Sequence, residues 1–144
     1  MVSVAAIFTS PVKSLSLSQQ TTVAVGISGI EDDRRFHLID GEGGLLTQRQ
    51  YGRLALVQAQ YLGESDYLTL RFPDGRVLEG LPELGGSVTT TMWGRQVSGR
   101  EVTGMWSEAL SSHCSSSVRL VKTDDPGACF DEYPVSLLSQ ASVD

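Results

Sequence analysis

Short runs of apolar and β-branched residues recur along the chain, separated by polar segments that carry glycine, proline or aspartate. Runs rich in Val, Ile, Thr and aromatic residues are typical of β-strands. We therefore expect strands at seven places: VSVAAIF (2–8), TTVAVGI (21–27), RFHLID (35–40), LALVQAQY (54–61), DYLTLRF (66–72), SVTTTMW (87–93) and SVRLVK (117–122).

The segments between these runs contain explicit turn signals, at DGEGG (40–44), PDG (73–75) and WGRQ (93–96). Each offers the glycine or aspartate that a hairpin needs. Many short strands at this spacing are typical of a barrel or a sandwich. The pattern predicts an all-β to β-rich α+β fold.

One segment, REVTGMWSEALSS (100–112), has the period of a helix instead. Its apolar residues fall three and four positions apart, which places them on one helical face. We predict one short amphipathic helix around residues 101–111, lying across one end of the β structure. Trp106, on the apolar face, is expected to fill the core rather than to stack on a cofactor.

The last part of the chain is expected to hold loops at LPELGGS (81–87) and TDDPGACFDEY (123–133). PVSLLSQASVD (134–144) then begins as an apolar strand, with Ser139 as the N-cap of a helix. We interpret residues 1–144 as a single domain and residues 134–144 as the start of a truncated following segment.

The charge pattern limits the partners of this 144-residue chain, whose net charge is −6. Nucleic acid is not expected, because binding phosphate backbones needs a basic face. No apolar run is long enough to span a membrane and no signal peptide is evident, so the cytoplasm is the expected compartment. Residues 1–53 hold five basic and five acidic residues, whereas residues 54–144 hold six and twelve. A small-anion site is therefore expected in the N-terminal third.

Basic residues in this third follow predicted strands and turns. Lys13 and Ser14 come after Pro11, Arg34 and Arg35 end the turn GIEDDRR, and Arg49 follows another strand. If these strand ends meet, an ammonium, a hydroxyl and guanidiniums converge, which suits a phosphate or carboxylate. The alternative is that Asp32, Asp33 or Asp40 pairs with these arginines in ordinary surface salt bridges.

The other candidate catalytic or metal-binding residues have weaker support from the sequence. Alternation along its strand places His37 opposite Phe36 and Leu38, so we expect a solvated histidine rather than a catalytic one. Cys114 and Cys129 fit neither a zinc pair nor a redox pair and are expected to be plain thiols, with Cys114 in a loop. A hydrolase or transferase built on EDD (31–33) and His37 is a minor alternative, because no nucleophile is placed near them.

Three motifs in order, SPVKSL, GISGIEDDRRFHLID and GGLLTQRQYGRLALVQA, resemble the N-terminal β-barrel region of MOSC proteins, relatives of the C-terminal domain of molybdenum cofactor sulfurase. The resemblance continues more loosely through Trp93–Gly94, MWSEAL (105–110), VRLV (118–121) and DEYPVSLLSQAS (131–142). It implies a closed or partly open β-barrel.

The resemblance also implies a role in holding molybdenum cofactor, a pterin that bears a phosphate and a dithiolene-bound metal. The family's cofactor contacts map to Lys13, Ser14 and Arg34. Asp131 matches a family aspartate, but the residues after it depart from the family pattern, so it is not included in the site. The family's metal-ligating cysteine lies beyond the SQAS segment, and neither Cys114 nor Cys129 aligns with it, so this chain alone is expected to be inactive.

The leading hypothesis is the N-terminal barrel domain of a molybdenum-cofactor-binding MOSC protein, a family whose chemistry is reduction or sulfur transfer. The alternative is a freestanding, non-enzymatic barrel that binds a small anionic ligand or a protein partner. The partners expected from the resemblance are the pterin-phosphate cofactor and either a catalytic MOSC segment or a redox partner protein.

Overall fold

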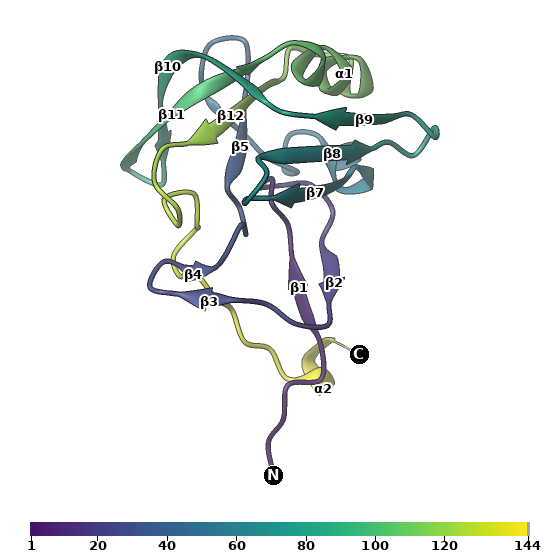
Figure 1. Cartoon of the computed structure of the whole chain (residues 1–144), viewed down its shortest axis with the longest axis vertical. Helices are drawn as coiled ribbons and strands as arrows, with labels where there is room; N and C mark the ends of the chain where they lie inside the picture. The colour runs from purple at the N-terminus through teal and green to yellow at the C-terminus, as the bar shows by residue number, and fades with distance from the viewer. Residues whose placement is uncertain (144) are drawn as a thin grey trace.

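The computed structural model describes residues 1–143, in which strands predominate (Figure 1). The largest sheet has five antiparallel strands in the order β10-β11-β12-β5-β6. Their bounds are Glu83–Met92 for β10, Arg95–Thr103 for β11, Arg119–Thr123 for β12, Phe36–Ile39 for β5 and Leu45–Leu46 for β6. Strand β5 is an inner strand, and all four of its residues are buried.

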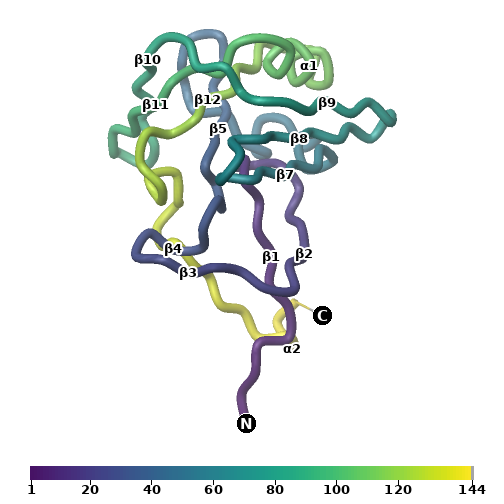
Figure 2. The backbone as a smooth tube through the Cα atoms, viewed as in Figure 1, coloured from purple at the N-terminus to yellow at the C-terminus, as the bar shows by residue number. Residues whose placement is uncertain are grey.

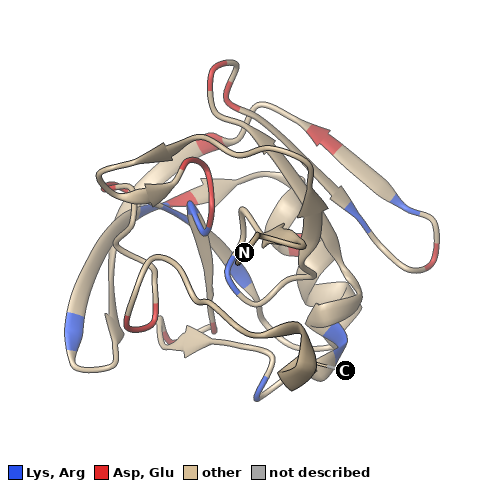
Figure 3. Cartoon of the chain, turned by 90° about the horizontal axis from the view of Figure 1, so that it is seen from below, with Lys and Arg blue, Asp and Glu red and all other residues tan. Residues whose placement is uncertain are grey.

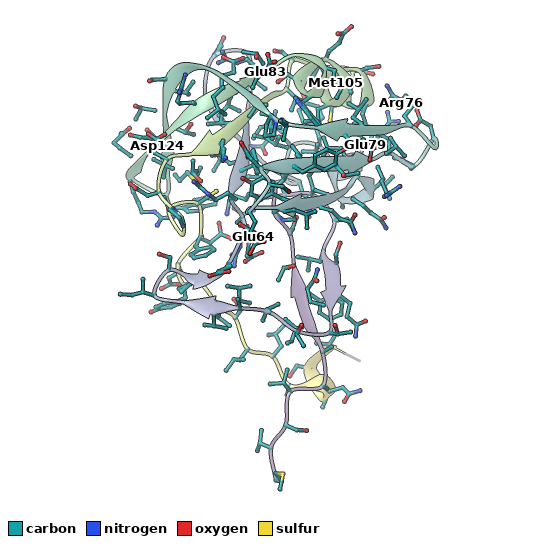
Figure 4. All side chains as sticks on the ribbon, viewed as in Figure 1. Glu64, Arg76, Glu79, Glu83, Met105 and Asp124 are labelled. Carbon is teal, nitrogen blue, oxygen red and sulfur yellow. The ribbon has the colours of Figure 1, made fainter. Side chains whose placement is uncertain are left out.

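A second sheet has three antiparallel strands, β7 (Gln58–Leu62), β8 (Tyr67–Arg71) and β9 (Val77–Gly80). In Figure 4, Arg76 and Glu79 mark the β8–β9 hairpin, which projects to the side of the molecule opposite Asp124. The register pairs Leu70 with both Ala59 and Leu78. Alternation along β8 therefore points one set of apolar side chains into the core.

Two short hairpins complete the strands: β1 (Ile7–Thr9) with β2 (Ser18–Gln20), and β3 (Val25–Gly26) with β4 (Gly29–Ile30). Both lie below the larger sheets in Figure 1. Figure 2 shows the C-terminal segment descending past β4 to the same end of the molecule as the N-terminus. We call the β1–β2 and β3–β4 hairpins together with residues 133–143 the arm region.

The main core lies between the two larger sheets and the helix α1 (Met105–Cys114), with a 3-10 helix, η1 (Gly52–Leu56), at its edge. Phe36, Leu70, Trp106 and Leu120 each expose 2% of their surface or less and belong to this one cluster. The expected role of Trp106 as core filling is confirmed. Burial of apolar surface on this scale is the main force that holds the sheets together.

The prediction of a β-rich α+β fold is confirmed, but the prediction of a barrel is not. The five-stranded sheet bends until β10 contacts β6, and His37 of β5 reaches Thr90 of β10. However, no ladder of hydrogen bonds joins β10 to β6 or to the three-stranded sheet among residues 1–143. The strands instead form separate sheets that pack around the core.

Several predicted element boundaries are wrong. Of residues 2–8 and 21–27, only Ile7, Phe8, Val25 and Gly26 lie in strands. The predicted loop at 81–87 is mostly the start of β10, and β11 was not predicted. Residues 134–138 form no strand, although a short helix, α2 (Gln140–Val143), does begin directly after Ser139.

The predicted helix is present but begins later than residue 101. Residues 101–103 continue β11, and Val102 packs into the core from that strand. Gly104 has a φ of 92°, a conformation that glycine adopts without strain, and this turn separates the strand from α1. The helix extends through Cys114, which was expected in a loop. No helix within residues 1–143 is long and apolar enough to cross a membrane.

Candidate functional site

Lys13 lies in a loop that enters the core. The loop joins β1 to β2, and its apolar residues Val12 and Leu15 are 0% and 2% exposed. The Lys13 backbone N–H donates to the Phe36 carbonyl at 2.9 Å, which ties the loop to β5. The lysine itself is only 6% exposed. A cation buried this far needs an anionic or polar partner.

The loop also brings Ser14 and Arg34 close to Lys13 in the fold. The Arg34 backbone N–H donates to the Ser10 carbonyl at 2.6 Å, so the two segments lie side by side. Ser14 and Arg34 have φ values of 77° and 47°, in the left-handed region that residues with a side chain rarely adopt. Backbone of this kind is held in place by its surroundings and is often found at functional sites.

The partner of Lys13 is Asp131, on the loop that follows β12. The Lys13 ammonium donates to Asp131 Oδ1, and the Trp93 indole Nε1–H donates to the same oxygen at 2.9 Å. Partial burial alone would raise the pKa of the Asp131 carboxyl, but the hydrogen bonds from Lys13 and Trp93 outweigh burial and lower that pKa. Asp131 is therefore a carboxylate at neutral pH.

Arg34 holds the same loop at a second point. Its guanidinium donates to Asp33 Oδ2 at 2.7 and 2.9 Å, lies 4.3 Å from the Phe130 ring centre, and donates to the Pro134 carbonyl at 2.9 Å. The expected alternative of an arginine–aspartate pair is thus correct for Arg34. Asp33 is only 7% exposed, so this is not an ordinary surface pair.

The surroundings of Cys129 show that the cations converge. Burial raises the pKa of its thiol to about 12, and the charges of Lys13, Arg34, Arg95 and Arg35 act against that rise. Arg95 also donates to the Phe130 carbonyl. Residues 129–131 therefore pass through a cluster of basic side chains.

Two of the remaining candidates, Arg35 and Arg49, have side-chain partners other than Asp131. Arg35 turns toward the end of β12, where its guanidinium donates to the hydroxyl of Thr123 at 3.2 Å and to the carbonyl of Asp124 at 3.4 Å. Arg49 lies 5.1 Å from the Trp93 ring centre, at the outer edge of the cluster. Figure 3 shows basic and acidic residues interspersed over the lower face of the molecule.

The expectation that His37 is solvated is wrong. It is 0% exposed, because β5 is covered on both faces, and its Nε2 pairs with Thr90 Oγ1 at 2.9 Å. His37 Nδ1 has no hydrogen-bond partner within residues 1–143. Burial, together with the nearby charge of Lys13, lowers the pKa of His37 to about 4. The histidine is therefore neutral in the folded chain.

The donor set fits an oxyanion. One carboxylate oxygen already accepts from Lys13 and Trp93, and the Ser14 hydroxyl makes no hydrogen bond within the described chain. The fit extends to a phosphate group of a cofactor but not to a metal. Cys114 and Cys129 are both buried, and residues 1–143 contain no group of three or more His, Cys, Asp or Glu that could hold a metal ion.

A cavity of about 540 Å³ lies elsewhere. It opens between the β1–β2 hairpin and the three-stranded sheet, and Lys13, Ser14 and Arg34 do not line it. Its charged lining residues are Glu31, Asp32, Glu79 and Arg71, a set that does not suit an anion. The basic cluster is therefore the better candidate for an anion site.

Three residues of this candidate site were not assigned to it from the sequence: Trp93, Arg95 and Asp131. Trp93 and Asp131 both lie in motifs that carry the family resemblance, and that placement was the available signal. Arg95 lies within the predicted turn at residues 93–96 and carried no signal beyond its charge.

Comparisons with known proteins agree with this architecture. Residues 1–119 match the family described as the MOSC N-terminal beta barrel domain, and the chain belongs to that family. The chain is also similar to the solution structure of a protein from Bordetella bronchiseptica, with 20% sequence identity and a TM-score of 0.50. That match covers 80% of this chain and 97% of the other chain, and shows a shared fold alone. No significant match was found among curated proteins.

Proposed function

We propose that this domain binds molybdenum cofactor through Lys13, Ser14 and Arg34, which hold its anionic pterin phosphate. The observation that carries the proposal is the Lys13 ammonium, 7% exposed as a side chain, whose counter-ion is the 64% exposed carboxylate of Asp131. An exposed carboxylate on a buried cation can be exchanged for another oxyanion. The family to which the chain belongs supports the identity of that anion.

Each residue has a defined task in this proposal. Lys13 supplies the charge, Ser14 supplies a hydroxyl that is not otherwise engaged, and Arg34 supplies a guanidinium that is 23% exposed as a side chain. Charged donors of this kind form the stronger class of hydrogen bonds to phosphate. When bound, the cofactor supplies a redox-active metal held by its dithiolene.

The proposal is tested by NMR titration of the full chain with molybdopterin and with simple phosphate esters. We expect amide shifts centred on Lys13, Ser14 and Arg34. Lys13→Met should weaken binding by about tenfold or more, because it removes the charged donor. Lys122→Met is the matched control, since Lys122 is 15% exposed as a side chain and pairs with Asp66. No shift at the three residues with any phosphate compound would contradict the proposal.

The arm region supports a second proposal, that the domain docks a catalytic MOSC segment. Large apolar side chains are exposed there, among them Ile27 at 107%, Leu137 at 88% and Leu138 at 78%. Exposed apolar groups gathered on one part of a small domain are typical of an interaction surface. Ile27→Asp should weaken binding of a separately purified, cysteine-bearing MOSC segment, measured by calorimetry. Unchanged affinity would contradict docking at this surface.

The alternative of a freestanding, non-enzymatic anion-binding domain rests on the same Lys13 cluster. The freestanding domain and the cofactor-binding domain predict different relative affinities for phosphate esters and molybdopterin. If phosphate esters bind as tightly as molybdopterin, and a catalytic segment has no effect, the freestanding reading is favoured. A preference of more than about tenfold for the pterin, equivalent to roughly 1.4 kcal/mol, favours the cofactor.

A further inference from the structure

We infer that Trp93 is a further ligand-binding residue of this anion site and that Asp131 is an internal anion that competes with the ligand. The ligand oxygen takes the place of Asp131 Oδ1, between the Lys13 ammonium and the Trp93 indole N–H. This inference rests on the proposed function, because it concerns the same site. It adds a donor and a competitor that the family resemblance did not assign.

The convergence of two donors on one atom is the first observation. Asp131 Oδ1 accepts from Trp93 Nε1 at 2.9 Å and from Lys13 Nζ. One donor is charged, both are directed at the same point, and the carboxylate that fills this point is 64% exposed. The carboxylate oxygen thus marks where an oxyanion from solution can bind.

The placement of Trp93 is the second observation. Trp93 and Gly94 form the two-residue turn between β10 and β11, with φ values of 51° and 82°. Both central residues of such a turn have positive φ, and asparagine or glycine is normally preferred there. Trp93 is also 53% exposed, so core packing does not account for a large aromatic residue in this strained position. Its hydrogen bond to Asp131 and its contact with Arg49 direct the indole to the basic cluster.

The chemistry at this point defines the class of ligand. An ammonium and an indole N–H both donate and neither accepts, so a cation or a neutral donor is excluded. Arg34 and Arg95 add positive charge nearby. The ligand is therefore an oxyanion with an accessible terminal oxygen, and a phosphate monoester is the class that the charge favours.

The test uses inorganic phosphate and pyrophosphate as probes with the full chain. The chain has two tryptophans, and Trp106 is 2% exposed in the core, so a change in fluorescence on titration reports on Trp93. Asp131→Asn should lower the apparent Kd for pyrophosphate by about tenfold, because the competing carboxylate is gone while Lys13 remains. Glu132→Gln removes the same charge from the next residue, which is exposed, and should change the Kd by less than about twofold.

Trp93→Phe keeps an aromatic ring but removes the N–H donor. It should raise the Kd by about tenfold or more, as expected for loss of one hydrogen bond to a charged group. Because this variant lacks the fluorescent reporter, its binding is followed by amide shifts of Lys13 and Ser14. Should Asp131→Asn lower stability, the phosphate-dependent rise in melting temperature gives a second measure of the same affinity.

The outcomes separate the two proposals. Equal affinities for Asp131→Asn and Glu132→Gln would show that Asp131 does not compete, and unchanged affinity in Trp93→Phe would remove the tryptophan from the site. Either result leaves Lys13, Ser14 and Arg34 as an anion site. Failure of the unsubstituted chain and all variants to bind phosphate or pyrophosphate would overturn the site itself and this inference with it.

Discussion

His37 should make the stability of this domain depend on pH. It is 0% exposed and neutral, and its pKa falls from the ordinary value of 6.5 to about 4 in the folded chain. In the unfolded chain the imidazole binds a proton below about pH 6.5, whereas in the folded chain it does so only near pH 4. Lowering the pH through this window therefore favours unfolding.

The magnitude follows from the pKa difference. Each unit of pKa corresponds to about 1.4 kcal/mol, so the full effect below pH 4 is about 3 kcal/mol. Between pH 7 and pH 5 the free energy of unfolding should fall by about 2 kcal/mol from this group alone. That is a large share of the 5–15 kcal/mol typical of a natural domain.

Urea unfolding at several pH values, followed by circular dichroism, measures this effect. Carboxyl groups also titrate in part of this range, so the comparison is with His37→Gln, which keeps a polar group near Thr90 but does not titrate. We expect the stability of the variant to fall by about 2 kcal/mol less than that of the unsubstituted chain between pH 7 and pH 5. Parallel pH profiles for the two chains would refute the reasoning, whatever their absolute stabilities.

Three further predictions concern packing and reactivity. Gly29→Ala should destabilise the domain by about 1–3 kcal/mol in urea unfolding, because its φ is +105° and an added Cβ would lie 2.7 Å from Pro134 Cβ. Gly75→Ala is the control, with a φ of +94° but open space around it, and an equal cost at both positions would exclude the contact as the cause. Trp106→Ala should cost about 3–5 kcal/mol, measured in the same way, and a cost below about 1 kcal/mol would contradict its place in the core. Cys129, with its pKa raised to about 12 and its side chain buried, should resist iodoacetamide until the chain unfolds, and rapid labelling of the folded chain would contradict this.

The sequence pattern predicted the strands whose alternation or apolar content is strong. Strands β5 and β8 fall within predicted runs, and β7 and β12 each extend one residue past the end of theirs. Strand β11 was missed because its apolar positions are diluted by glycine and charged residues. Gly99 is required there, since a Cβ would lie 2.5 Å from the Lys122 carbonyl oxygen. The predicted turn at Trp93–Gly94 already required a partner strand after it, so β11 could have been inferred from that turn.

His37 shows where period-two alternation fails. A strand alternates between exposed and buried residues only when one face is solvated. Strand β5 is an inner strand covered on both faces, so Phe36, His37 and Leu38 are all buried. The sequence contains no local sign of the second covering layer, because that layer comes from residues such as Thr90, far along the chain.

Only the residues of the candidate site that lie in local motifs could be predicted from the sequence. Lys13, Ser14 and Arg34 lie in local motifs, and the chain brings their segments together through β5. Asp131 lies 118 residues from Lys13. That pairing depends on the path of the loop after β12, and neither charge spacing nor strand period determines such a path.

The anchoring of residues 130–134 has a consequence for the rate of ligand exchange. The Phe130 ring lies under Arg34, the Phe130 carbonyl accepts from Arg95, and the Pro134 carbonyl accepts from Arg34. The backbone on both sides of Asp131 is thus fixed, and the carboxylate can leave Lys13 by rotation of its own side chain. Such rotations take picoseconds to nanoseconds, whereas loop opening is slower. Exchange of an external phosphate for Asp131 should therefore be limited by diffusion and dissociation of the phosphate, not by a conformational change of the domain.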